Sequence, residues 1–218
     1  MQSIRALIAL THKSGVKSIT KLSPLSLSSA RGMSSAVSDL LVGKKLVWVD
    51  CEMTGLDVNT DRLLEVAVIV TNGNLDTIKQ LGPYVIKTSQ TILDSMNEWC
   101  VKTHNESGLV KQCLESDTTA EEVDKKLFES MHELGISNGL LAGNSVSYDR
   151  LFLNKYCPKF SSCLHYRTVD VSTIKELVRI WYKKDESFKK RLTHRAIDDI
   201  TESIAELQFY RENYFIVK

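Results

Sequence analysis

Leu46-Val47-Trp48-Val49-Asp50-Cys51-Glu52-Met53-Thr54-Gly55-Leu56 is the stretch that decides the fold, because an apolar strand runs directly into two carboxylates separated by one residue. Side chains at positions i and i+2 of a strand lie on the same face, so Asp50 and Glu52 share that face with about 7 Å between their Cα atoms. Two acids this close repel each other unless a cation lies between them, as in a metal site. A lone Asp-x-Glu arises by chance about once in a chain this long, so other residues must decide between a metal site and a solvated strand end.

The composition is that of one ordinary globular domain. The 218 residues are 43% hydrophobic and 25% charged. A chain of this length and hydrophobic content can form a substantial buried core. No apolar run reaches the roughly 18 to 20 residues that cross a bilayer, so no membrane partner is expected. The cysteines are odd in number and contain no Cys-x-x-Cys pair: Cys51, Cys100, Cys113, Cys157 and Cys163. This pattern argues against a disulfide framework and against a zinc site, and it favours a reducing compartment.

Residues 1–38 differ from the rest of the chain. They contain five basic residues and many serines, and the first acid is Asp39. This composition is typical of a mitochondrial transit peptide, with a disordered leader as the alternative. We therefore predict a leader at 1–38 and a single domain at 39–218, with import into the mitochondrial matrix or intermembrane space. A second start at Met33 would give a cytoplasmic or nuclear product without the leader.

The charge of the predicted domain limits its nucleic-acid contacts. Without the five leader residues, 23 basic residues face 27 acids, so the domain carries a formal net charge of −4. Proteins that grip long nucleic acids neutralise many phosphates with a basic surface. If the substrate is a nucleic acid, we therefore expect the domain to contact few of its phosphates.

Hydrophobic patterning predicts an α/β domain with a mixed sheet, beginning with three antiparallel strands. We expect strands at 46–50, 64–70, 77–86, 140–144 and 166–171, and helices at 94–100, 106–114, 119–134, 148–156, 172–182 and 196–210. A charged loop is expected at 183–191.

Several residues are expected to set the ends and faces of these helices. Thr118 or Thr119 should cap the helix that Gly135 ends, and Ser172 should cap a later helix. Leu151, Phe152 and Tyr156 are expected on the inner side of helix 148–156.

Two later segments place further acids where a sheet edge can form a site. Gly143-Asn144-Ser145-Val146-Ser147-Tyr148-Asp149-Arg150 puts Asp149 at a strand-to-helix junction, and Thr193-His194-Arg195-Ala196-Ile197-Asp198-Asp199 puts a histidine and two acids at a helix start. Taken singly, Asp149 could be an ordinary acid favoured by the helix dipole, and Asp199 a solvated helix residue.

Taken together, these segments resemble the DEDDh exonucleases, whose motifs are Asp-x-Glu, an isolated Asp and His-x-x-x-x-Asp in that order. The segments 48–56, 143–145, 166–172 and 194–200 are similar, more closely, to the oligoribonuclease family. The resemblance covers about residues 44 to 212 and leaves out the first 38.

The resemblance implies a ribonuclease H-like fold, with a mixed central sheet flanked by helices, and an exonuclease domain at 39–218. It implies removal of 5′ mononucleotides from the 3′ end of very short RNA. Two divalent cations, Mg²⁺ or Mn²⁺, would be held by hard oxygen ligands. The implied ligands are Asp50, Glu52, Asp149 and Asp199.

His194 would accept the proton of the attacking water, since its ordinary pKa lies near working pH. The alternative is a helix-capping or surface histidine paired with Asp198. Periodicity does not decide between the adjacent Asp198 and Asp199. The histidine and aspartate of the family motif are five residues apart, so the resemblance implies Asp199 as the ligand. Glu65 and Asp170 remain candidates for acids that lie behind the ligands.

The resemblance also implies a pocket for short RNA with a 5′ phosphate. Leu56 would separate two bases and Trp99 would stack on one, and a core position is the alternative for both. Ser145 would contact the 5′ phosphate. The neighbouring subunit of an obligate homodimer would supply three further residues: Tyr166, Arg167 and Ser172. A guanidinium such as that of Arg167 suits this task, because it can grip a terminal phosphate with two hydrogen bonds, although a surface ion pair is its alternative role. No other stable protein partner is expected.

Two other functions remain open on the sequence. A DEDDh exonuclease acting on longer RNA or DNA would differ in its activity on chains well beyond five nucleotides. A catalytically silent RNA-binding module on the same fold would not need the intact Asp50, Glu52, Asp149, His194 and Asp199.

Overall fold

The computed structural model describes residues 44–182, 188 and 195–215. The predicted leader at 1–38, all of the predicted loop at 183–191 except Phe188, and His194 lie outside these residues. Among the described residues, no helix combines the length and the apolar character needed to span a membrane.

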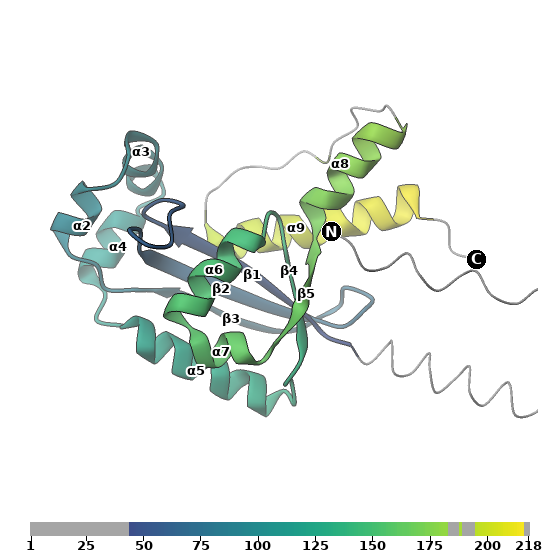
Figure 1. Ribbon diagram of the computed structural model, residues 1–218, viewed down its shortest axis with the longest axis horizontal. Helices are drawn as coiled ribbons and strands as arrows, with labels where there is room; N and C mark the ends of the chain where they lie inside the picture. Colours follow the sequence, from purple (N-terminus) through teal and green to yellow (C-terminus); the bar gives the residue numbers. More distant parts are fainter. Residues whose placement is uncertain (1–43, 183–187, 189–194, 216–218) are drawn as a thin grey trace, which may run out of the picture. The chain divides into compact units, whose positions relative to one another are not determined.

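A five-stranded mixed sheet forms the centre of the domain, with strand order β3-β2-β1-β4-β5 (Figure 1). The strands are β1 (Leu46–Met53), β2 (Leu63–Thr71), β3 (Thr77–Val85), β4 (Gly139–Gly143) and β5 (Leu164–Asp170). β1, β2 and β3 pair antiparallel, whereas β4 runs parallel to both β1 and β5. The predicted antiparallel opening and the predicted mixed sheet are therefore confirmed.

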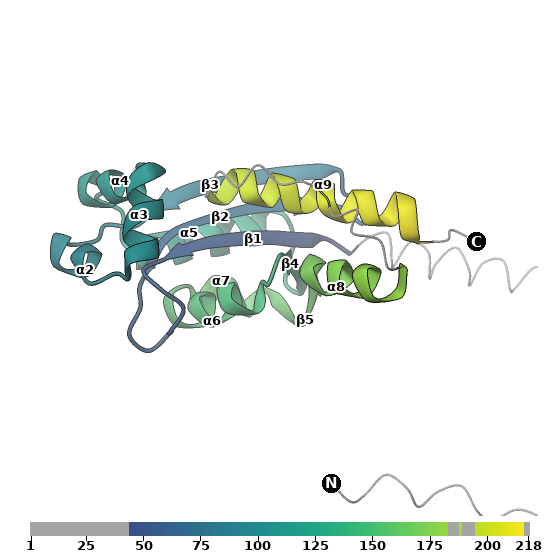
Figure 2. The same ribbon diagram turned by 90° about the horizontal axis from the view of Figure 1, so that it is seen from above.

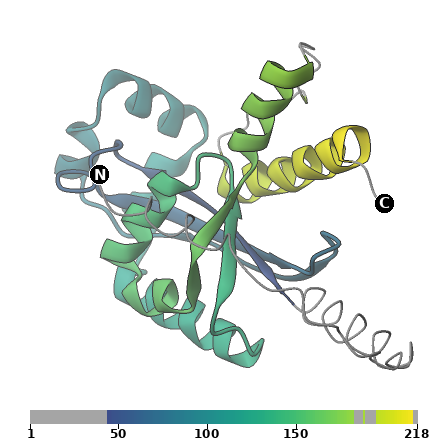
Figure 3. The same cartoon turned by 45° about the vertical axis from the view of Figure 1, so that its right-hand side comes forward.

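Helices cover both faces of the sheet and one of its ends (Figure 3). They are α2 (Gln90–Asp94), α3 (Glu98–Glu106), α4 (Leu109–Glu115), α5 (Ala120–Glu133), α6 (Ser147–Tyr156), α7 (Pro158–Ser162), α8 (Val171–Tyr182) and α9 (Ala196–Tyr214). Helices α5, α6 and α7 pack on one face of the sheet, and α8 and α9 pack on the other. β2 is buried along its whole length, as expected for a strand covered on both sides.

Alternation along β1 decides which way the two acids point. Val47 and Val49 belong to the core beneath α5, α6 and α7, whereas Leu46 and Trp48 belong to the core beneath α9. Because side chains alternate along a strand, Asp50 and Glu52 follow Leu46 and Trp48 on the α9 face. The strand thus directs both carboxylates toward the helix that carries Asp199.

The ends of α5 follow the sequence closely. Thr119 accepts a hydrogen bond from the Glu122 amide, and the Glu122 carboxylate accepts one from the Thr119 amide at 2.8 Å. This reciprocal capping box satisfies amides that have no partner within the helix. Gly135 follows the helix with a φ of +64°, a conformation that glycine adopts without steric cost.

The helical region after β3 differs from the prediction. The single helix expected at 94–100 is divided into α2 and α3, because Asn97 accepts a hydrogen bond from the Cys100 amide and starts a new helix. The helix expected at 106–114 starts only after Gly108, which has a φ of +76°. Local capping therefore outweighs the hydrophobic periodicity here.

Three further details correct the prediction. Leu151, expected on the inner side of α6, is 47% exposed, and Leu153 is buried instead. Helix α7 was not predicted; the buried Asp124 carboxylate accepts hydrogen bonds from the Lys159 and Phe160 amides at its start. Ser172 does not cap α8, which begins at Val171.

Candidate metal centre and nucleotide pocket

Three carboxylates meet between β1 and α9. Asp50, Glu52 and Asp199 each offer an oxygen, and these oxygens lie within 4.8 Å of one another. All three side chains are partly buried. Asp50 and Glu52 project from the α9 face of β1, and Asp199 lies in the first turn of α9. The structure thus brings together three of the four acids that the sequence selected.

The start of α9 is held by a buried ion pair. Glu65 on β2 is fully buried, and its Oε2 lies 3.0 Å from Nη2 of Arg195. Its Oε1 accepts a hydrogen bond of 3.2 Å from the Ala196 amide. These contacts fix the first turn of α9, so that Asp199 joins the carboxylate cluster while Asp198 is exposed. Glu65 therefore lies behind the cluster and holds the start of the helix that carries Asp199.

Asp149 reaches the same strand from the opposite side. It lies in the first turn of α6, it is buried, and its Oδ1 accepts a hydrogen bond of 2.8 Å from the Cys51 amide. Burial raises the pKa of Asp149 to about 7, against the lowering effect of its backbone hydrogen bonds. Asp149 thus lies next to the strand segment between Asp50 and Glu52.

Glu52 shows the electrostatic strain of the cluster. Burial raises the pKa of Glu52 to about 8, and the negative charges of Asp199, Glu65 and Asp149 contribute. A cation held by these carboxylates would relieve that repulsion. The donor set consists of carboxylate oxygens, which suit hard divalent ions. The chemistry of these residues therefore fits divalent metal binding.

Beside Glu52 lies a pocket of about 520 Å³. Leu56 and Trp99 line it, and each is 61% exposed, so neither is a core residue. Leu56 belongs to the loop between β1 and β2, and Trp99 to α3. Figure 1 shows this loop and this helix at the same end of the sheet. The pocket is also lined by Cys51, Glu52, Met53, Gly55, Asn97, Cys100 and His104. Two apolar side chains at the mouth of a pocket beside the carboxylates can contact a base.

His104 was not predicted as a site residue. It is buried, its Nε2 lies 2.9 Å from the Met53 carbonyl oxygen, and its Nδ1 lies 3.9 Å from Oε2 of Glu52. His104 lies on α3, five residues after Trp99. No motif in the sequence indicates that it belongs to the site. Only the packing of α3 against the end of β1 places it there.

A second cluster surrounds Ser145, which lies just after the end of β4 and has a φ of +52°. The hydroxyl oxygens of Ser145 and Ser172 lie 3.2 Å apart, and Ser172 donates a hydrogen bond of 3.0 Å to Oδ1 of Asn144. Oδ1 of Asp170 accepts hydrogen bonds from the amides of both serines, at 3.0 and 2.9 Å. Ser145 and Ser172 are therefore neighbours within one chain, which differs from the expectation that a partner subunit brings Ser172 to the cap.

Tyr166 and Arg167 lie on the edge strand β5. Tyr166 is 74% exposed and stacks against His165, with ring centroids 4.3 Å apart. The exposed Arg167 guanidinium lies over the Tyr166 ring, 5.2 Å from its centroid. Both side chains are thus accessible at the edge of the sheet.

Comparison with known proteins identifies the family. A family model described as an exonuclease matches residues 47–207. The mouse protein "Oligoribonuclease, mitochondrial" is 45% identical over 194 residues, which cover 85% of this chain and 81% of the mouse protein. The chain belongs to the oligoribonuclease family of exonucleases. Within this oligoribonuclease family, the Drosophila melanogaster "Probable oligoribonuclease" is 49% identical over 175 residues, covering 78% of this chain and 82% of that protein. An oligoribonuclease of Francisella tularensis subsp. novicida is 44% identical over 77% of this chain and 94% of its own length.

Solved structures of exonuclease I share the fold of this oligoribonuclease family member. The enzyme from Methylocaldum szegediense superposes with a TM-score of 0.61 at 16% identity, and the zinc-bound Escherichia coli enzyme with single-stranded DNA with a TM-score of 0.58 at 14% identity. The matches cover 78% of this chain and 41% of each exonuclease I chain, so this chain spans about two fifths of their length. The predicted ribonuclease H-like exonuclease fold is confirmed.

Proposed function

We propose that this chain is a metal-dependent 3′ to 5′ exoribonuclease that hydrolyses very short oligoribonucleotides, dinucleotides especially, to 5′ mononucleotides. The carboxylate cluster of Asp50, Glu52 and Asp199 beside the pocket of Leu56 and Trp99 carries this proposal. The identity of 42 to 49% to curated oligoribonucleases supports it.

Four side chains would hold the metal: Asp50, Glu52, Asp149 and Asp199. Two Mg²⁺ or Mn²⁺ ions, when bound, would acidify the attacking water and stabilise the leaving 3′ oxygen. The Cys51 amide fixes the Asp149 carboxylate, and the anchored start of α9 fixes Asp199. His194 lies outside the described residues, and we assign it the acceptance of the water's proton from its place in the His-x-x-x-x-Asp motif.

The pocket would hold the two nucleotides on either side of the cleaved bond. Leu56 would separate their bases, and Trp99 would stack on one of them. The serine pair Ser145 and Ser172 would face the 5′ phosphate, together with Tyr166 and Arg167. Such a pocket closes on both ends of a dinucleotide and needs few basic residues, in keeping with the acidic domain.

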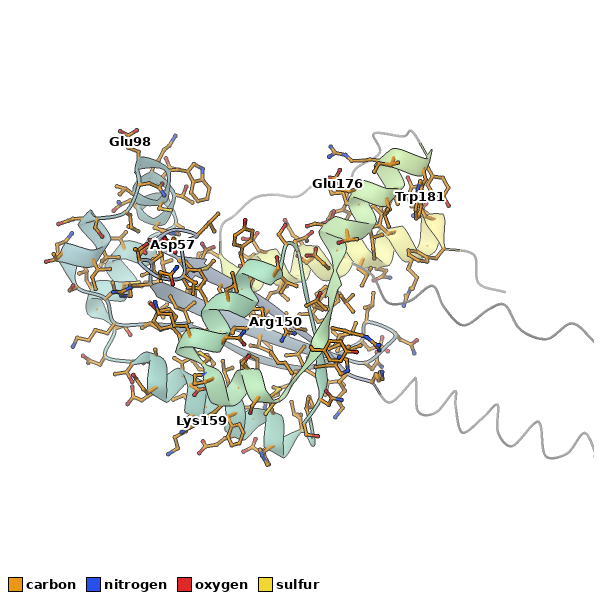
Figure 4. All side chains as sticks on the ribbon, in the orientation of Figure 1. Asp57, Glu98, Arg150, Lys159, Glu176 and Trp181 are labelled. Atoms are coloured by element: carbon orange, nitrogen blue, oxygen red, sulfur yellow. The ribbon has the colours of Figure 1, made fainter. Side chains whose placement is uncertain are left out.

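We propose a homodimer in which Tyr166 and Arg167 serve the site of the partner. Both lie on the edge strand β5 and are exposed. The side chains of Ile180 and Trp181 on α8 are 65% and 67% exposed, and Figure 4 shows Trp181 on this helix. Aromatic side chains such as that of Trp181 are enriched in protein–protein interfaces.

We place the protein in mitochondria. The composition of residues 1–38 matches a transit peptide, and mouse, bovine and human relatives are named mitochondrial oligoribonucleases. We propose that the leader is removed on import into the matrix or the intermembrane space, and that a start at Met33 gives a cytoplasmic or nuclear product.

An assay of mononucleotide release tests the proposed activity and the choice of ligand together. With Mg²⁺ and a short 5′-labelled RNA, the protein should shorten the RNA from its 3′ end. Asp199→Asn should lower kcat/KM by about a thousandfold, because a lost ligand costs several kcal/mol of transition-state stabilisation.

Asp198→Asn is the matched control, because it changes the same chemical group one residue earlier on the exposed side of α9. It should leave kcat/KM within about threefold of the wild type. An inactive Asp198→Asn with an active Asp199→Asn would overturn the ligand assignment, and no release by the wild type would overturn the function.

A further inference from the structure

The loop that carries Leu56 is closed on itself by its own polar groups. Residues 54–62 form this loop, which connects β1 to β2. Thr54 donates a hydrogen bond of 2.9 Å to Oδ1 of Asp61, while its hydroxyl oxygen accepts one of 2.9 Å from the Arg62 amide. Oδ2 of Asp61 accepts a hydrogen bond of 2.9 Å from the Asp57 amide. The Asp61 carboxylate is therefore the internal hub of the loop.

The closed loop is fastened to the last turn of α6. The Tyr156 hydroxyl donates a hydrogen bond of 2.8 Å to the Asp61 carbonyl oxygen. The Lys155 ammonium donates to the carbonyl oxygens of Val58 and Asn59, the latter at 3.3 Å. Figure 2 shows the loop beside α6. Two adjacent side chains of one helix thus hold three carbonyl groups of the loop, those of Val58, Asn59 and Asp61.

Packing supports the same attachment. Val58 and Tyr156 are partly buried and pack against one hydrophobic core cluster, which lies beneath α5, α6 and α7. The Tyr156 ring stacks on the buried Phe152 one turn earlier, with centroids 6.1 Å apart. Leu56, by contrast, remains 61% exposed and lines the pocket. The loop is anchored at one side, and Leu56 on it lines the pocket.

The opposite end of α6 carries Asp149, which binds the Cys51 amide beside the carboxylate cluster. From Asp149 to Tyr156 the helix rises by about 10 Å. One rigid helix therefore contacts both the metal-binding strand and the loop of Leu56.

We propose that Lys155 and Tyr156 are positioning residues that fix Leu56 at a set distance from the carboxylates, and that this brace determines the preference for dinucleotides. The inference rests on the proposed function. Without the brace the loop moves, Leu56 no longer meets the bases in a fixed place, and longer RNA passes it more easily. Asp149 and the other carboxylates keep their positions.

The test uses the double variant Lys155→Met/Tyr156→Phe, which keeps the aliphatic stem and the ring but removes the three hydrogen bonds. Hydrogen exchange of the Asp57 and Asp61 amides should accelerate by about tenfold, because each lost bond weakens the closed loop. The KM for a 5′-phosphorylated diribonucleotide should rise by about five- to tenfold with kcat within about twofold, and the preference over a 20-mer should fall by the same factor. Mn²⁺ binding should match that of the wild type.

Lys159→Met/Tyr84→Phe is the control. It changes an exposed lysine of α7 and a tyrosine packed against the same core, and it should leave the exchange and the preference unchanged. The proposal is overturned if the brace variant exchanges like the wild type, or if its exchange accelerates while KM and the preference stay the same. A wild type without any preference for dinucleotides would contradict the proposed function, whereas the exchange of the two amides would still decide whether α6 holds the loop.

Discussion

Glu52 makes the stability of the metal-free protein depend on pH. The pKa of Glu52 in the folded protein is raised to about 8 from an ordinary value of 4.5. Between these two values the folded state binds more protons than the unfolded state, so the free energy of unfolding falls as the pH rises. Asp149, with a pKa raised to about 7, acts in the same direction.

Thermal unfolding in EDTA should therefore give a lower Tm at pH 8 than at pH 5.5, and Mg²⁺ or Mn²⁺ should restore more stability at pH 8 than at pH 5.5. Glu52→Gln should make the decline shallower, since it removes one of the two carboxyl groups with a raised pKa. A Tm that rises over this range in EDTA, or an equal slope in Glu52→Gln, would contradict the assignment of strained carboxylates.

The anchoring of α9 shows how one buried pair places an entire element. Arg195 is the cation that faces the fully buried Glu65, and its side chain is 25% exposed. Arg195→Met should lower the free energy of unfolding by about 3 kcal/mol, because it leaves a buried carboxylate without its cation.

The exposed pair of Lys87 and Asp117 provides the comparison, with side chains 61% and 97% exposed. Lys87→Met should cost less than about 1 kcal/mol, since water screens such a pair. Urea unfolding of both variants measures the difference. Equal losses would mean that the Glu65 contacts do not hold the start of α9.

The elements that the sequence predicted best are those with strong local signals. Alternation along β1 and the capping box at Thr119 and Glu122 are both short-range patterns, and both are present. The break before α3 depends on one hydrogen bond, which the Cys100 amide donates to the Asn97 side chain. The hydrophobic pattern of this segment is equally compatible with a continuous helix. Hydrophobic periodicity alone does not distinguish a continuous helix from two capped helices.

The candidate site shows the same limit. The shared face of Asp50 and Glu52 follows from the period of a strand, whereas the choice of Asp199 comes from the family's motif spacing. His104 reaches Glu52 only through the packing of α3 on β1, and the bond between Asp149 and the Cys51 amide joins residues 98 positions apart. Contacts of that kind come from the tertiary fold, and no window of sequence contains them.

At the scale of the whole molecule, the dimer is testable by complementation. Asp50→Ala and Arg167→Ala should each be nearly inactive alone. A purified heterodimer of the two should recover about half of the wild-type activity, because one of its two sites regains both an intact carboxylate cluster and an intact arginine from the partner. No recovery in a verified heterodimer would place Arg167 in the site of its own chain.

The most direct test of the central claim is a comparison of substrate length. Residues 39–218 with Mg²⁺ should be given a 5′-phosphorylated diribonucleotide and a 20-mer in competition, and kcat/KM should be measured for each. A small pocket beside the carboxylates predicts a higher kcat/KM for the diribonucleotide, by at least about tenfold. Equal values, or a preference for the 20-mer, would contradict the account and indicate an exonuclease of longer chains.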